Sequence, residues 1–133
     1  MAVFTNKLNG VRAVLTIGAL VFLLFGIVFL FFPGKFLDTF PGEPLTPALN
    51  TTLAIAGTLC LCWAIAMVVA LSDVLRSRSL VQAIILLQLI AGVRGFYYDT
   101  FVVKQIGGSA ANVLVIILGV LLIVFYPWKD QTG

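Results

Sequence analysis

The chain has 133 residues, of which 62% are hydrophobic and only 10% are charged, and its formal net charge is +3. Water-soluble domains average roughly 25% charged residues, so this composition excludes a soluble globular protein and indicates that lipid surrounds most side chains. The lysines and arginines are scattered near segment ends, with no basic stripe of the kind that binds nucleic acid. The chain has no histidine, which removes the commonest general base and the commonest metal ligand.

The first predicted membrane helix covers residues 11–32, an apolar run with no charge after Arg12. At about 1.5 Å per residue it is long enough to cross a bilayer once. Pro33 and Gly34 end this helix, because proline cannot continue the helical hydrogen-bond ladder. The apolar run is too long for the hydrophobic part of a cleaved signal peptide, so we expect it to be retained.

The next segment, residues 35–47, combines Asp38 and Glu43 with prolines and apolar side chains. This composition fits either a half-buried turn at the level of the lipid headgroups or an ordinary solvent loop. The second predicted span then covers residues 48–71. Thr46 supplies an N-cap hydroxyl to this helix, and a proline occupies its first position.

The third predicted span covers residues 80–103. Ser79, just before it, and Gln82, in its first turn, match a capping box. The fourth predicted span covers residues 110–126. No linker is long enough to divide the chain, so we predict a single domain, residues 1–133. Its predicted fold is an all-α membrane protein, an antiparallel bundle of four transmembrane helices.

The distribution of lysine and arginine predicts the orientation of this bundle. The side that carries the N-terminus holds Lys7, Arg12, Arg76, Arg78 and Lys129, whereas the other side holds Lys35 and Lys104. Positive residues favour the cytoplasmic side of a membrane protein. We therefore expect both termini in the cytoplasm.

Arg94 is the most unusual residue of the chain, because it lies well inside the third apolar run. A cation inside a membrane span costs at least about 2.5 kcal/mol on insertion scales, so it normally has a partner or a water-filled recess. Counting from Ser79 places Arg94 in the outer half of the membrane, with its side chain leaning toward the cytoplasmic side. Other polar and aromatic residues are expected near this level: Tyr97, Tyr98, Asp99, Asp38, Glu43, Asn50 and Asn112.

Two interpretations of this group stay open. In the first, Arg94 is a structural ion-pair partner of a carboxylate, and the tyrosines belong to an ordinary aromatic belt. In the second, the group forms a recess at the outer leaflet that binds an anionic or polar ligand group.

Signals of catalysis are weak. The sequence contains no Ser–His pair, no phosphate-binding loop and no cluster of metal ligands. Cys60 and Cys62 lack the C-x-x-C spacing of a thiol redox centre and are interpreted as small packing residues. Gln82 and Gln88, inside the third span, are interpreted as packing residues that bond across helices. We therefore predict no catalytic residue, metal or cofactor.

One stretch of the sequence resembles a known family. It runs from Gly10-Val11-Arg12 through Gly18 and Gly26 to Phe32-Pro33-Gly34-Lys35-Phe36, within a four-span chain of this size. This pattern resembles the DoxX-like group of small bacterial inner-membrane proteins and their uncharacterised relatives. The resemblance covers most of the chain in hydropathy and the first span in residues. It implies a four-span fold and, as in some members, a link to quinone-dependent oxidation or to redox partners.

These observations favour a non-enzymatic integral membrane protein that binds a lipid-like ligand or a membrane partner at the outer-leaflet recess. One alternative is a small transporter or channel acting as a dimer, because one four-helix bundle is too thin to enclose a wide path. A second alternative, implied by the resemblance, is a subunit of a quinone-linked oxidoreductase. The expected partners are the lipid bilayer and either another membrane protein or a second copy of the chain, and not nucleic acid.

Overall fold

The computed structural model describes residues 2–38, 44–103 and 106–128, and these residues are helical apart from short connections. The helices are α1 (Ala2–Phe31), α2 (Pro33–Leu37), α3 (Pro47–Ser72), α4 (Arg78–Tyr97), the π-helical segment η1 (Tyr98–Val103) and α5 (Ile106–Phe125). Within the described residues, the segments long and apolar enough to cross a membrane are α1, α3 and the stretch Arg78–Val102; Ala110–Phe125 is a shorter apolar helix. The prediction of an all-α fold is confirmed, and the long apolar helices are compatible with a membrane protein.

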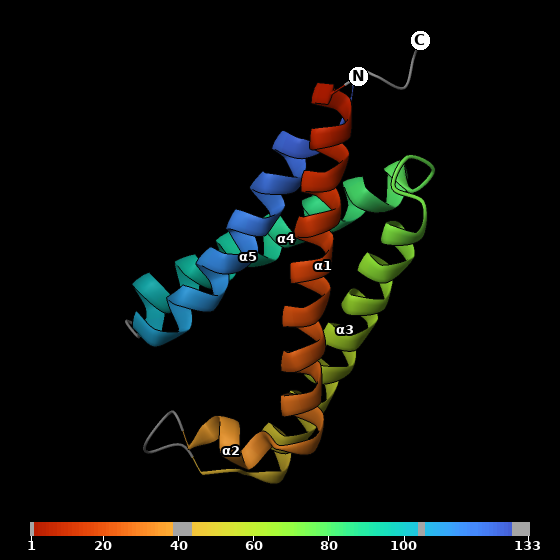
Figure 1. The fold of residues 1–133 in the computed structure, drawn as a ribbon. Helices are drawn as coiled ribbons and strands as arrows, with labels where there is room; N and C mark the ends of the chain where they lie inside the picture. The colour runs from red at the N-terminus through yellow and green to blue at the C-terminus, as the bar shows by residue number, and fades with distance from the viewer. Residues whose placement is uncertain (1, 39–43, 104–105, 129–133) are drawn as a thin grey trace.

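The long helices form two antiparallel hairpins, α1 with α3 and α4 with α5 (Figure 1). The hairpins meet where α1 begins, where α3 turns into α4 and where α5 ends. From this region, which we call the convergent end, they diverge, so that the start of α3 and the start of α5 lie apart (Figure 1). The region where they have separated is called the open end below.

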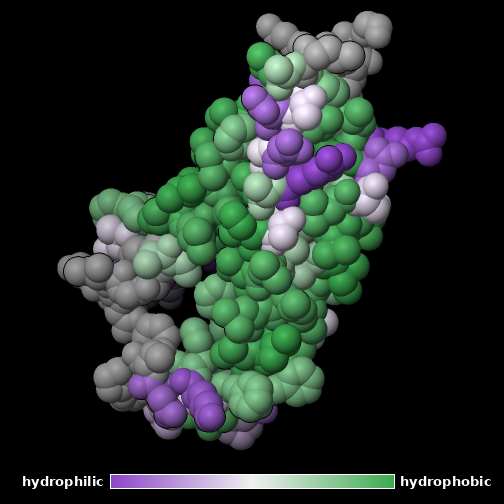
Figure 2. Space-filling model, in the orientation of Figure 1, coloured by the Kyte–Doolittle hydropathy of each residue, from purple (hydrophilic) through white to green (hydrophobic). Residues whose placement is uncertain are grey.

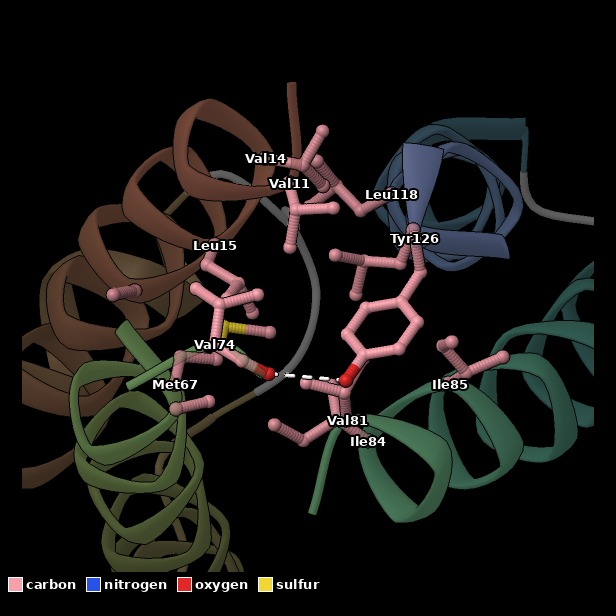
Figure 3. Packing of buried hydrophobic residues seen from close by; sticks show 13 residues of the cluster. Val11, Val14, Leu15, Met67, Val74, Val81, Ile84, Ile85, Leu118 and Tyr126 are labelled. Atoms are coloured by element: carbon pink, nitrogen blue, oxygen red, sulfur yellow. Dashed lines mark hydrogen bonds between the residues drawn. The ribbon is translucent and has the colours of Figure 1, made fainter. Parts of the chain in front are cut away.

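The hydrophobic core lies at the convergent end (Figure 3). All four long helices contribute side chains to it, including Leu15 of α1, Met67 of α3, Val81 of α4 and Leu122 of α5. The phenol of Tyr126, just beyond α5, is buried and donates a hydrogen bond of 3.0 Å to the carbonyl oxygen of Val74, in the turn between α3 and α4. The end of the second hairpin is thereby fixed to the connection between the two.

Two helices begin before the first residue of the corresponding predicted span. α1 begins at Ala2 rather than at residue 11, because polar side chains before the apolar run are compatible with a helix and continue it toward the N-terminus. α4 begins at Arg78 with Ser77 at its N-cap, so the predicted capping box of Ser79 and Gln82 does not form. The N-cap of α3 is confirmed, since the Thr46 hydroxyl accepts a hydrogen bond of 3.2 Å from the backbone N–H of Leu49.

The segment after α1 folds against the helix that precedes it. Pro33 opens α2, and the ring of the half-buried Phe36 packs edge-on against Phe29, with ring centroids 4.7 Å apart. This packing agrees with the half-buried alternative for the described part of the connection. Residues 39–43, which include Glu43, lie outside the described residues.

Hydrophilic and hydrophobic residues occupy different parts of the surface of the α1–α3 hairpin. Hydrophilic residues gather at its two ends, and a broad hydrophobic surface lies between them (Figure 2). Many large apolar side chains on the long helices are exposed, among them Leu24, Ile65 and Val93. Burying such a surface in hydrocarbon is favourable, so the surface supports a membrane protein, as the composition predicts.

Candidate functional site

The divergence of the hairpins leaves a cleft of about 300 Å³ between them. Its walls come from all four long helices, and most of its lining is apolar. The lining residues are Phe22, Leu59, Cys60, Trp63, Leu87, Gln88, Ile90, Ala91, Gly92, Asn112 and Val115. The core of the convergent end begins about one helical turn further along, at Met67, Ile84 and Leu118, so it closes the cleft on that side.

Polar atoms without hydrogen-bond partners distinguish this cleft. Gln88 is only 1% exposed, and in the described structure neither its Oε1 nor its Nε2 atom has a partner. The indole Nε1 of Trp63, whose ring packs 6.0 Å from that of Phe22, is also buried without a partner. Each such atom costs roughly 1–3 kcal/mol relative to a paired one. An apolar side chain at position 88 would avoid this cost, so stability alone does not explain the glutamine.

A second, larger groove is not lined by Gln88 or Trp63, the described residues that carry these unpaired polar atoms. It has a volume of about 440 Å³, lies on the α1–α3 hairpin and is lined almost entirely by aliphatic side chains. Its polar lining residue is Thr16, whose hydroxyl donates a hydrogen bond of 2.8 Å to the carbonyl oxygen of Arg12. The groove therefore offers a ligand little beyond apolar contact, and the cleft between the hairpins is the better candidate site.

Close packing of α4 on α5 places a further polar residue on the cleft wall. A Cβ atom at Gly92 would lie 2.6 Å from Ile116, and one at Gly95 would collide with the side chain of Asn112. Glycine at these positions lets Asn112 lie between the helices, where its Nδ2 donates a hydrogen bond of 2.6 Å to Oδ2 of Asp99. Asp99 belongs to η1, and π-helical turns of this kind are frequent at functional sites.

The structure brings together only part of the predicted recess. Asp99 and Asn112 are bonded to each other, and Asn112 lines the cleft. Arg94 is exposed near the end of α4, does not line the cleft, and makes no hydrogen bond or ion pair within the described part of the chain. Tyr97 and Tyr98 are exposed as well, and the Tyr97 ring packs against Phe101 at 5.2 Å.

The remaining predicted site residues belong to the other hairpin. Asp38 follows α2, and Asn50 lies in the first turn of α3; both are exposed. Among the described residues no contact joins α2 to α4, η1 or α5, and Figure 1 shows α2 apart from the end of α4. These residues therefore do not share one recess with Arg94 in this arrangement. Glu43, also predicted for the recess, is outside the described residues.

Two residues of the cleft were missed or misjudged from the sequence. Gln88 was interpreted as a packing residue that bonds across helices, whereas it is buried without a partner. Trp63 was not considered, because a tryptophan in an apolar run carries no sign of which neighbour its N–H will meet. The available signal was Gln88 itself, an uncharged polar residue in the middle of a predicted span.

Comparison of the chain with protein-family models, with curated proteins and with solved structures finds no match. The resemblance to the DoxX-like group therefore stays a prediction from the sequence of the first span. Any functional conclusion has to come from the cleft and its side chains.

Proposed function

We propose that the protein is a non-enzymatic, four-span membrane protein that binds a lipid-like ligand in the cleft between its hairpins. The observation that carries this proposal is the combination of an apolar cleft with three buried polar atoms, on Trp63 and Gln88, that have no hydrogen-bond partner among the described residues. Small-molecule sites are commonly of this kind, mostly apolar with a few polar groups, and have volumes of roughly 300–1,000 Å³. The cleft lies at the lower limit of this range.

The proposal treats α5 as a fourth crossing. Its 20 residues give a length of about 30 Å, comparable to the hydrocarbon thickness, and it runs antiparallel to α4. Arg76 lies in the turn between α3 and α4, and Arg78 begins α4, at the end where α1 begins and α5 ends. A cytoplasmic location for this end follows from its excess of positive residues, and the open end then faces the outer leaflet.

This placement puts the polar atoms deep in the membrane. Gln88 lies about 15 Å along α4 from Arg78, close to the middle of the hydrocarbon. Water is scarce at this depth, so an unpaired amide there costs more than it would near a surface. A ligand that enters between the hairpins from the outer leaflet can provide the missing partners.

Binding fits the cleft better than conduction or catalysis. The core formed by residues such as Met67 and Ile84 closes one side of the cleft, so a continuous path would require a second copy of the chain. The described lining residues include neither a carboxylate nor a cationic side chain that could serve as an acid or base. A ligand-binding role requires only an apolar cleft and a few buried polar atoms, and both are found here.

A variant that fills the cleft tests the proposal. Ala91 lines the cleft, whereas Ala83 is exposed on the same helix and does not. Wild-type protein, Ala91→Phe and Ala83→Phe would be purified in mild detergent, and the lipids retained by each would be identified by mass spectrometry. We expect wild-type protein and Ala83→Phe to retain the same enriched species and Ala91→Phe to lose it. Equal lipid retention by all three proteins would contradict a ligand site in this cleft.

A further inference from the structure

We infer that the head group of the ligand is uncharged and combines a carbonyl acceptor with a hydroxyl or amide donor, as in monoacylglycerols and fatty-acid amides. This inference rests on the proposed function, which concerns only where a ligand binds. The inference on the head group adds the chemistry of the ligand, and it follows from the hydrogen-bonding capacity, charge and shape of the cleft.

The unpaired atoms define what a ligand must offer. Gln88 presents two N–H donors and one carbonyl acceptor, and the indole of Trp63 presents one N–H donor. Donors therefore outnumber acceptors by three to one on this wall. The best complement is a head group with at least two acceptor oxygens and one donor, which the ester carbonyl and hydroxyls of a monoacylglycerol provide.

The charges around the cleft exclude an ionised head group. Among the residues that the structure describes, no lysine or arginine lines it, and Arg94 is exposed elsewhere on α4. The Asp99 carboxylate accepts a hydrogen bond from Asn112 on the wall and would repel an anion, and the thiol of the lining residue Cys60 provides no positive charge. A buried carboxylate or phosphate would therefore have no counter-ion. A cationic head group would likewise find no carboxylate among the lining residues.

The apolar lining determines where the tail of the ligand lies. Leu59 and Ile90 line the cleft and are also largely exposed on the outer surface, at 63% and 56%. The cleft wall thus continues into the surface that faces lipid. A volume of about 300 Å³ corresponds to roughly ten water-sized groups of about 30 Å³. It accommodates a head group and the first carbons of a chain, and the rest of the chain extends between the hairpins into the bilayer.

Pairing requires a small adjustment of the wall. Neighbouring side chains cover the amide of Gln88 in this arrangement, so the flexible glutamine side chain has to turn toward the head group. The alternative occupant is a small cluster of water, which needs two to four polar partners per molecule. Water would satisfy the same atoms without selecting among lipids, and a competition between lipids therefore separates the two cases.

Fluorescence of Trp63 offers a direct measurement. The chain has two tryptophans, so Trp128→Phe leaves Trp63 as the sole reporter. A dibrominated monoacylglycerol and the dibrominated fatty acid of equal chain length would be titrated as quenchers into this protein in detergent. A pH of about 9, well above the usual pKa of a carboxyl group, keeps the acid ionised. Gln88→Leu removes the amide, and Gln82→Leu, at an exposed site on the same helix, is the matched control.

We expect saturable quenching by the monoacylglycerol with at least tenfold higher affinity than by the ionised acid. Gln88→Leu should weaken monoacylglycerol binding about tenfold, the equivalent of losing roughly 1.4 kcal/mol of hydrogen bonding, while Gln82→Leu leaves it unchanged. Equal affinities for the two probes, or unchanged binding by Gln88→Leu, would overturn the inference on the head group.

The cleft-filling variant separates this inference from the proposed function. One possible result is that the two probes bind equally well and that Ala91→Phe abolishes their saturable quenching. The cleft then binds lipids, and only the inferred head group is wrong. If neither probe saturates, or if Ala91→Phe leaves quenching unchanged, the ligand site itself is wrong and the inference is overturned with it.

Discussion

The convergent and open ends of the molecule are built from similar residues but differ in whether their polar side-chain atoms have hydrogen-bond partners. At the convergent end, the phenol of Tyr126 donates to the Val74 carbonyl, and the indole of Trp128 donates to the carbonyl oxygen of Ile123 at 2.9 Å. In the cleft toward the open end, the indole of Trp63 and the amide of Gln88 have no partner within the described structure. The first arrangement stabilises the fold, and the second leaves hydrogen-bonding capacity for a molecule that is not part of the chain.

The largest expected effect concerns the convergent end. Tyr126→Ala removes a buried ring and the hydrogen bond to Val74, so we expect a loss of about 3–5 kcal/mol in the free energy of unfolding. Tyr97→Ala is the matched control, because Tyr97 is 61% exposed. Equilibrium unfolding in detergent measures both. Equal losses for the two variants would show that the convergent end is not the stabilising region.

An intermediate effect is expected where α4 packs on α5. A methyl group at Gly95 would collide with Asn112 and displace it from Asp99. We expect Gly95→Ala to cost roughly 1–3 kcal/mol, which combines overpacking with a lost hydrogen bond. Gly34→Ala is the control, since a Cβ atom there meets nothing within 4 Å. The result to look for is a lower thermal unfolding temperature for Gly95→Ala alone; an unchanged value would mean that the Asn112–Asp99 contact is not part of the packed fold.

In the cleft, by contrast, we expect a substitution that increases the free energy of unfolding. Gln88→Leu replaces unpaired polar atoms with an apolar side chain of similar size, so it should stabilise the ligand-free protein by roughly 1–3 kcal/mol. Thermal unfolding of delipidated protein is the measurement, with Gln82→Leu as the control for an exposed site on the same helix. A destabilised Gln88→Leu variant would show that the glutamine is a packing residue with partners, as its sequence position first indicated.

The smallest effect is expected for the cysteines. Cys62 is exposed and Cys60 is half-buried on the cleft wall, and the two are not joined by a disulfide. Changing both to alanine should lower the free energy of unfolding, measured by equilibrium unfolding in detergent, by about 1 kcal/mol or less. Loss of a redox activity from a stably folded double variant would instead favour the oxidoreductase alternative.

The helices could be predicted from the sequence, whereas the cleft could not. Apolar runs together with Thr46 and Pro33 mark where membrane segments begin and end, because these residues act on the local backbone. Helical segments of polar residues, such as the start of α1, give no comparable signal. Asp99 and Asn112 could be assigned to one level by counting residues along predicted helices.

The surroundings of Gln88 and Trp63 cannot be predicted by counting residues along the helices. Whether their polar atoms meet a partner is determined by the angle between the two hairpins, which arises from packing around Tyr126 and its neighbours at the convergent end. The same angle separates Asp38 and Asn50 from Arg94, although all three were predicted near one membrane level. Counting residues along a predicted helix therefore gives a position along the helix axis, and it does not give the lateral position.

An experimental structure of the protein in lipid nanodiscs tests the central claim most directly. The account predicts elongated density in the cleft, with a head group within about 3 Å of the Gln88 amide and the Trp63 indole and a tail that leaves between the hairpins. A structure in which the hairpins close on each other, with the Gln88 amide bonded to another side chain of the protein and no density in the cleft, would contradict it.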